Sequence, residues 1–133
     1  YCLSDDRALL AAMAEEGPPW PVSQLAQQAG ISALQYAPDW PFRVHQPLEE
    51  ERRYLSQELS RLRFHVYPSD SNFLLFQGEE GWRERLLDRG ILIRSCADFQ
   101  GLGPGFYRVC VRSRGENKRL IQAIQQEREA FHG

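Results

Sequence analysis

Residues 91–112 read Ile-Leu-Ile-Arg-Ser-Cys-Ala-Asp-Phe-Gln-Gly-Leu-Gly-Pro-Gly-Phe-Tyr-Arg-Val-Cys-Val-Arg, and this stretch decides the predicted fold. Two runs rich in β-branched and aromatic residues flank a turn that contains three glycines and a proline, a pattern typical of two strands. Side chains alternate along a strand, so Arg94 shares a face with Leu92 and Cys96. In the second strand Arg108 and Arg112 share one face, opposite Tyr107, Val109 and Val111. The opposite faces can meet a core through Ile91, Ile93, Tyr107, Val109 and Val111.

An arginine within a strand is costly unless its guanidinium meets water or an anion. Its planar fork suits a carboxylate or a phosphate, to which it can donate two hydrogen bonds at once. The alternative is a solvated outer face of the sheet with surface ion pairs. Periodicity alone leaves both interpretations open for Arg94 and Arg108.

Composition describes an ordinary globular protein, with 42% hydrophobic and 26% charged residues in 133. This length suits one domain with a modest core, or part of a larger protein. The net charge of −2 gives no general attraction to nucleic acid or to an anionic membrane. No apolar run approaches the roughly 20 residues of a membrane span, and no signal peptide is apparent. We therefore expect a cytoplasmic protein with no nucleic-acid or membrane partner.

The side chains most often used in catalysis and metal binding are sparse. Three cysteines and three histidines are scattered without the spacing of a zinc site, so reduced thiols and no metal are expected. Lys118 is the only lysine, and it falls on the predicted polar side of a surface helix, where nothing would lower its pKa. No residue of the chain is predicted to be catalytic.

The order of elements predicts an α+β fold, in which a small, mainly antiparallel sheet carries helices on one face behind two leading helices. Tyr1 to Leu3 resembles the end of a strand that enters from a preceding part of the protein. We expect residues 1–46 to hold the leading helices and residues 47–133 to form the α+β domain. The predicted helices are 4–16, 21–36, one that begins at Pro47, 79–88 and one that begins at the capping box Ser113-Arg114-Gly115-Glu116, and the other strands are 64–67 and 72–76.

Several pieces of the chain, in order, resemble the C-terminal part of the fold type I pyridoxal-phosphate aminotransferases. The resemblance is greatest to the histidinol-phosphate aminotransferase and threonine-phosphate decarboxylase group. Each piece alone is weak, but the ordered set covers essentially the whole chain. The pieces are Pro19-Trp20-Pro21-Val22-Ser23, Tyr67-Pro68-Ser69-Asp70-Ser71-Asn72-Phe73-Leu74-Leu75-Phe76, Arg89-Gly90-Ile91-Leu92-Ile93-Arg94, Tyr107-Arg108-Val109 and Glu116-Asn117.

The resemblance implies substrate-binding roles for two residues. Arg108 matches the arginine that holds the substrate α-carboxylate, and Arg94 matches one that helps to hold the substrate phosphate. Residues 94–103 and 108–112 look most like the decarboxylases, which make the aminopropanol phosphate used in cobalamin assembly. The substrate implied is a small phosphorylated amino acid.

The resemblance also implies that much of the catalytic machinery lies upstream. Tyr1 matches the tyrosine that closes the family's Gly-x-Arg-x-Gly-Tyr segment, just after the Schiff-base lysine. Pyridoxal 5′-phosphate is therefore expected in the full-length enzyme and not in this fragment. The full-length enzyme is expected to be a homodimer. The fragment should be inactive without the large N-terminal domain of the same chain. The alternatives are a histidinol-phosphate aminotransferase, a free-standing regulatory module that binds anions or amino acids, and a structural dimerisation piece.

Overall fold

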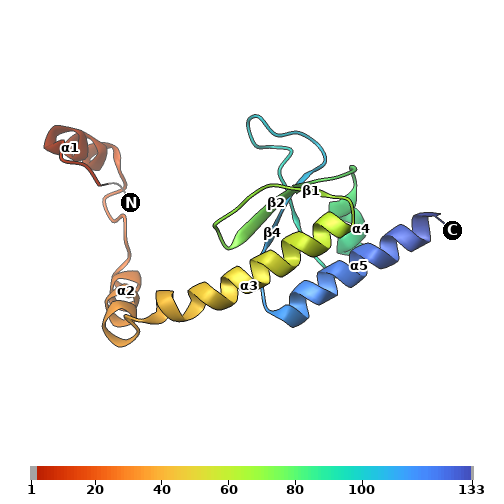
Figure 1. Cartoon of the computed structure of the whole chain (residues 1–133). Coiled ribbons are helices and arrows are strands. Elements are labelled where there is room, and N and C mark those ends of the chain that lie inside the picture. The colour runs from red at the N-terminus through yellow and green to blue at the C-terminus, as the bar shows by residue number, and fades with distance from the viewer. Residues whose placement is uncertain (1–2, 133) are drawn as a thin grey trace. The chain divides into compact units, whose positions relative to one another are not determined.

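The computed structural model describes residues 3–132 (Figure 1). The chain divides into two units, Tyr1–Trp40 and Pro41–Gly133. The first unit holds α1 (Arg7–Glu16) and α2 (Gln24–Tyr36). Asp6 caps α1 by accepting hydrogen bonds from the amides of Ala8 and Leu9, and Ser23 caps α2. Neither helix contains a buried residue. The predicted strand end at Tyr1 and Cys2 lies outside the described residues.

The long helix α3 (Trp40–Arg61) begins earlier than predicted. Pro41, and not Pro47, occupies its first turn, where a missing amide hydrogen costs little. Pro47 lies inside the helix. It has no amide hydrogen to donate to the preceding turn, yet the helix continues to Arg61. Residues 40–46 therefore belong to the helix that was predicted to begin at Pro47.

The second unit contains one antiparallel sheet in the order β1-β2-β4-β3. Its strands are β1 (His65–Val66), β2 (Phe73–Gln77), β3 (Arg94–Ser95) and β4 (Phe106–Cys110). Helix α4 (Trp82–Asp88) connects β2 to β3, and α5 (Arg114–His132) follows β4. The central pair β2–β4 is extended by a bond from the Gly78 amide to the Gly105 carbonyl, at 2.9 Å. It is also tied to α4, because the Tyr107 hydroxyl accepts from the Trp82 amide and donates to the Glu79 carbonyl.

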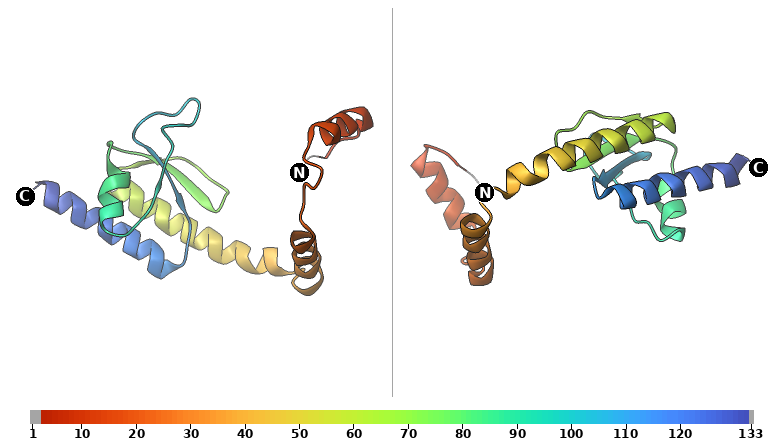
Figure 2. Two further views of the ribbon diagram at one scale, coloured as in Figure 1. Left: turned by 180° about the vertical axis from the view of Figure 1, so that it is seen from behind. Right: turned by 60° about the horizontal axis from the view of Figure 1, so that its bottom comes forward.

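One face of the sheet is covered by helices and the other is open. The sheet lies behind α3 and α5 in Figure 1 and in front of them in the view from behind (Figure 2). Leu74 and Phe76 of β2 and Tyr107 and Val109 of β4 point into the core. The helices complete that core with Leu55, Leu59, Trp82, Leu86, Leu120, Ile121, Ala123 and Ile124. The predicted α+β class, a small antiparallel sheet with helices on one face behind two leading helices, is confirmed.

The strand that precedes the glycine-rich turn is shorter than predicted. The first arginine-bearing strand has only two residues, because regular pairing with β4 is confined to Arg94 and Ser95. Cys96 is only 2% exposed, but it does not belong to the core cluster beneath the helices, and its amide donates to the Phe106 carbonyl at 2.8 Å. On α4, Trp82 and Leu86 are buried, whereas Leu87 is 47% exposed. Within residues 3–132, no helix is both long enough and apolar enough to cross a membrane.

Candidate anion-binding site

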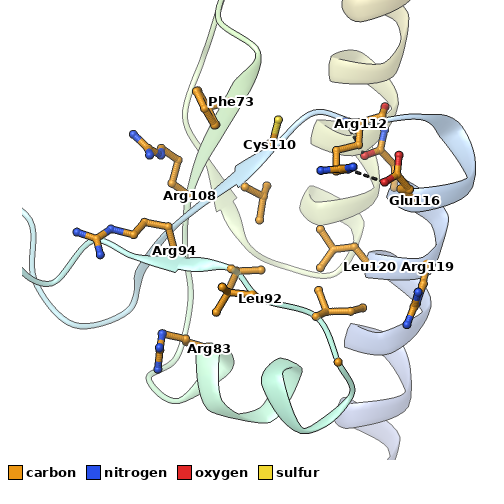
Figure 3. Close-up of a pocket in the computed structure, with 15 residues that line it drawn as sticks. Phe73, Arg83, Leu92, Arg94, Arg108, Cys110, Arg112, Glu116, Arg119 and Leu120 are labelled. Carbon is orange, nitrogen blue, oxygen red and sulfur yellow. Dashed lines mark hydrogen bonds and ion pairs between the residues drawn. The ribbon is translucent and has the colours of Figure 1, made fainter.

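The two arginines singled out in the sequence lie opposite each other on the open face of the sheet. Arg94 of β3 and Arg108 of β4 are direct partners in the antiparallel ladder. Residues paired in this way place their side chains on the same face, about 4.5–5.5 Å apart at Cβ. Figure 3 shows both side chains projecting from the same side of the strands. The strand periodicity that places an arginine on the polar face of each strand thus brings Arg94 and Arg108 together.

Arg94 is partly neutralised by its own loop. Its Nη2 donates to Oδ2 of Asp98 at 2.5 Å, and both side chains are more than half exposed. Its guanidinium carbon also lies 5.5 Å from the centre of the Phe99 ring. An exposed pair of this kind is weak, so an incoming anion can replace the carboxylate of Asp98.

Arg108 is held without a carboxylate. Its guanidinium carbon lies 4.5 Å from the centre of the Phe73 ring, in cation–π geometry, and its side chain is half-buried. Within residues 3–132, no ion pair or hydrogen bond neutralises this guanidinium. Because like charges on directly opposed strand residues repel, the Arg94–Arg108 pair favours occupation by an anion.

A pocket of about 570 Å³ adjoins this pair, where residues 90–93 diverge from the end of β4. Its lining includes five arginines, Arg83, Arg94, Arg108, Arg112 and Arg119, and only one carboxylate, that of Glu116. The remaining lining is mostly apolar and comes from Phe73, Ile91, Leu92, Ile93, Val109 and Leu120. A volume of this size suits a small organic ligand, and the charge favours an anionic one.

The far end of the pocket is fixed by the buried side chain of Asn117. Its Oδ1 accepts from the Arg112 amide at 3.1 Å, and its Nδ2 donates to the Arg112 carbonyl at 2.8 Å. Nδ2 also donates to Glu51 of α3, whose carboxylate accepts from Arg114. Glu51 thereby links α3 to α5.

Two titrating groups near the pocket have shifted pKa values. Hydrogen bonds from the Ser113 hydroxyl and from Arg112 lower the pKa of the Glu116 carboxyl below its usual 4.5. Burial raises the pKa of the Cys96 thiol, and the positive charges of Arg108 and Arg94 only partly oppose that effect. Burial therefore disfavours the thiolate form of Cys96, while the Glu116 carboxylate is already paired with Arg112.

Sequence reasoning found the arginine pair but missed what surrounds it. Phe73 was assigned only to a strand, although strand alternation places it on the open face. Arg83 and Arg119 line the same pocket from helices, and no motif signalled them because their approach depends on packing of α4 and α5. Arg112, which the sequence left without a contact, forms an ion pair with Glu116 at 2.6 Å.

Comparison with known proteins gives this geometry a family context. The model of the family "Aminotransferase class I and II" matches residues 1–124. A threonine-phosphate decarboxylase of Salmonella typhimurium is 39% identical over 129 residues, covering 94% of this chain and 35% of that protein. A histidinol-phosphate aminotransferase of Methanoculleus marisnigri is 38% identical over 88 residues, covering 62% of this chain and 25% of the relative. The chain thus spans about a third or less of the length of these curated relatives.

Solved structures show the same fold. The histidinol-phosphate aminotransferase from Clostridium acetobutylicum aligns with a TM-score of 0.80 and 23% identity, over 92% of this chain and 38% of that one. The L-threonine-O-3-phosphate decarboxylase from Porphyromonas gingivalis aligns with a TM-score of 0.76 and 24% identity, over 93% of this chain and 40% of that one. Since the family model spans nearly the whole chain and the fold agrees with it, this chain belongs to the aminotransferase class I and II family.

Proposed function

We propose that this chain is the substrate-binding C-terminal part of a pyridoxal-phosphate enzyme that acts on a small phosphorylated amino acid. The enzyme we propose is a threonine-phosphate decarboxylase. The observation that carries the proposal is the cross-strand pair of Arg94 and Arg108 on the open face of the sheet. The 39% identity to a threonine-phosphate decarboxylase over almost the whole chain supports the substrate class.

Each arginine suits one end of such a substrate. Arg108, which has no carboxylate partner within residues 3–132, would receive the α-carboxylate through its planar fork. Arg94 would receive the phosphate, whose greater charge competes well with the exposed carboxylate of Asp98. Holding both ends fixes the orientation of the bonds at Cα, which is how this chain would contribute to rate.

We infer that the cofactor itself is held mainly by other parts of the enzyme. Lys118, the only lysine, lies on α5, is exposed and does not line the arginine pocket. Pyridoxal phosphate supplies the electron sink for decarboxylation or transamination, and the protein must bind and orient it. We assign that binding, and any contact between subunits of a homodimer, to parts of the enzyme outside these 133 residues.

The test uses the intact protein that contains this chain. Arg108→Ala should lower kcat/KM by about 10²- to 10³-fold, because a bidentate, charge-assisted contact to the carboxylate is lost. Arg108→Lys should restore only part of the activity, since a lysine keeps the charge and loses the fork. Arg53→Ala, which removes an exposed arginine paired with Glu49 on α3, is the matched control. Unchanged turnover and substrate affinity in Arg108→Ala would refute the assignment.

A histidinol-phosphate aminotransferase is the second candidate, supported by 38% identity to one such enzyme over 88 residues. The two activities separate in one assay of the intact protein. Release of carbon dioxide from threonine phosphate without an oxo-acid acceptor identifies the decarboxylase. Turnover of histidinol phosphate that depends on 2-oxoglutarate identifies the aminotransferase.

A further inference from the structure

The aromatic ring of Phe73 lies beneath the guanidinium of Arg108. The guanidinium carbon is 4.5 Å from the ring centre, within the distance of about 6 Å at which a cation–π contact is significant. In the β2–β4 ladder, Leu75 is the direct partner of Arg108, and Phe73 is the partner of Cys110. Phe73 is therefore the diagonal neighbour of Arg108 on the same face, a position from which an aromatic side chain can reach it.

A cation–π contact differs from an ion pair in what it leaves available. An aromatic ring offers no lone pair, so it occupies none of the five N–H donors of the guanidinium with a conventional hydrogen bond. The Asp98 carboxylate, in contrast, accepts a hydrogen bond from Arg94 and partly neutralises it. Phe73 thus restricts the orientation of Arg108 and leaves both its charge and its fork free for a ligand.

Phe73 is itself held by the turn that precedes β2. The Ser69 hydroxyl donates to the Phe73 carbonyl at 2.6 Å, and the Phe73 amide donates to the Ser71 hydroxyl at 3.3 Å. These bonds fix the strand where its other neighbour, β1, no longer pairs with it. The Pro68–Ser71 turn therefore anchors the residue that supports the arginine.

We propose that Phe73 is a positioning residue for Arg108: its ring presents the guanidinium, pre-oriented and un-neutralised, to the carboxylate of the substrate. This inference rests on the proposed function only for the identity of the ligand. Pre-orientation saves the entropy of fixing a long side chain when the ligand binds. A phenylalanine to leucine change should then weaken binding, whereas tyrosine should replace phenylalanine.

The first measurement concerns Arg108 itself and needs no activity. In nuclear magnetic resonance spectra of the 133-residue chain, a ring centred 4.5 Å from the guanidinium carbon of Arg108 shifts the Arg108 side-chain resonances through its ring current. Phe73→Leu should abolish that shift and Phe73→Tyr should keep it. Phe106→Leu is the matched control, because Phe106 is another half-buried phenylalanine on the same face that stacks on Tyr67 instead.

The second measurement uses the intact protein. Phe73→Leu should raise KM for the substrate about three- to thirtyfold, the range expected for a cation–π contact, with a smaller change in kcat. Phe73→Tyr should return KM to within about twofold of the wild type, and Phe106→Leu should leave it unchanged. Thermal unfolding of each variant separates a loss of fold from a loss of positioning, and the tyrosine variant decides the matter if the leucine variant is unstable.

The results distinguish the two proposals. Arg108 resonances and KM that are the same in Phe73→Leu as in the wild type would overturn the role of Phe73 and leave that of Arg108 intact. Unchanged substrate affinity in Arg108→Ala would overturn the proposed function. The resonance shifts would still decide whether Phe73 orients Arg108.

Discussion

Arg94 and Arg108 are direct cross-strand partners, and within residues 3–132 only Arg94 has a carboxylate partner, Asp98. Two guanidinium groups in this relationship repel each other. The Asp98 carboxylate reduces that repulsion while the site holds no ligand, and Phe73 supports the second guanidinium without neutralising it. The resulting site keeps a net positive charge and has a defined geometry before a ligand arrives.

The first prediction concerns this repulsion. Asp98→Asn should lower the free energy of unfolding by about 0.5–1 kcal/mol at low salt, because it leaves two adjacent guanidiniums without a counter-charge. The loss should largely disappear in 1 M salt, where the screening length falls to about 3 Å. Urea denaturation at the two salt concentrations measures both values.

Glu49→Gln is the matched control for Asp98→Asn. It breaks a similarly exposed pair, that of Glu49 and Arg53 on α3, and leaves no cross-strand pair of arginines behind. Its effect should be smaller at low salt. Equal losses in the two variants would contradict a specific role for Asp98 beside the arginine pair.

The second prediction concerns the buried amide of Asn117. Asn117→Ala should lower the free energy of unfolding by about 2–4 kcal/mol, because it leaves the amide and carbonyl of Arg112 without their partners. Asn72→Ala, at an exposed position, should cost less than about 1 kcal/mol. Chemical denaturation compares the two, and a cost for Asn117→Ala no larger than that for Asn72→Ala would show that water replaces these bonds.

The sequence predicted the features that repeat along the chain. The alternation of residues 106–111 identified the face of β4 that carries Arg108, and hydrophobic spacing identified the helices that cover the opposite face. It failed where a single distant contact decides the outcome. Glu51 of α3, for example, contacts Asn117 and Arg114 of α5, which lie 66 and 63 residues further along the chain. The candidate site was predicted only in part. The arginine pair follows from strand periodicity, whereas Arg83 and Arg119 reach the pocket only through tertiary packing.

The third prediction separates two costs at the turn before β4. Gly101 and Gly105 have nearly equal positive φ values, 85° and 86°, which disfavour any side chain. A Cβ at Gly101 would meet nothing within 4 Å, whereas one at Gly105 would lie 2.5 Å from the carbonyl oxygen of Gly78. Gly101→Ala should therefore cost about 1–2 kcal/mol, and Gly105→Ala at least 1–3 kcal/mol more, because the backbone must move. Thermal or urea unfolding gives the difference, and equal costs would show that the two backbones separate freely at this point.

The fourth prediction concerns the acid side of the stability profile. Hydrogen bonds from the Ser113 hydroxyl and from Arg112 lower the pKa of Glu116 in the folded chain below 4.5. A group whose pKa is lowered by folding stabilises the fold above its unfolded pKa, and that contribution is lost as the pH falls through the folded pKa. The difference in unfolding free energy between the wild type and Glu116→Gln should therefore be constant above about pH 5.5 and should shrink as the pH falls below 4.5.

Ser113→Ala removes the largest cause of the pKa shift, so it should reduce the pH dependence of that difference. Urea denaturation between pH 3 and pH 7 tests both variants. A difference that stays constant down to pH 3 would mean that Glu116 titrates alike in the folded and unfolded chains.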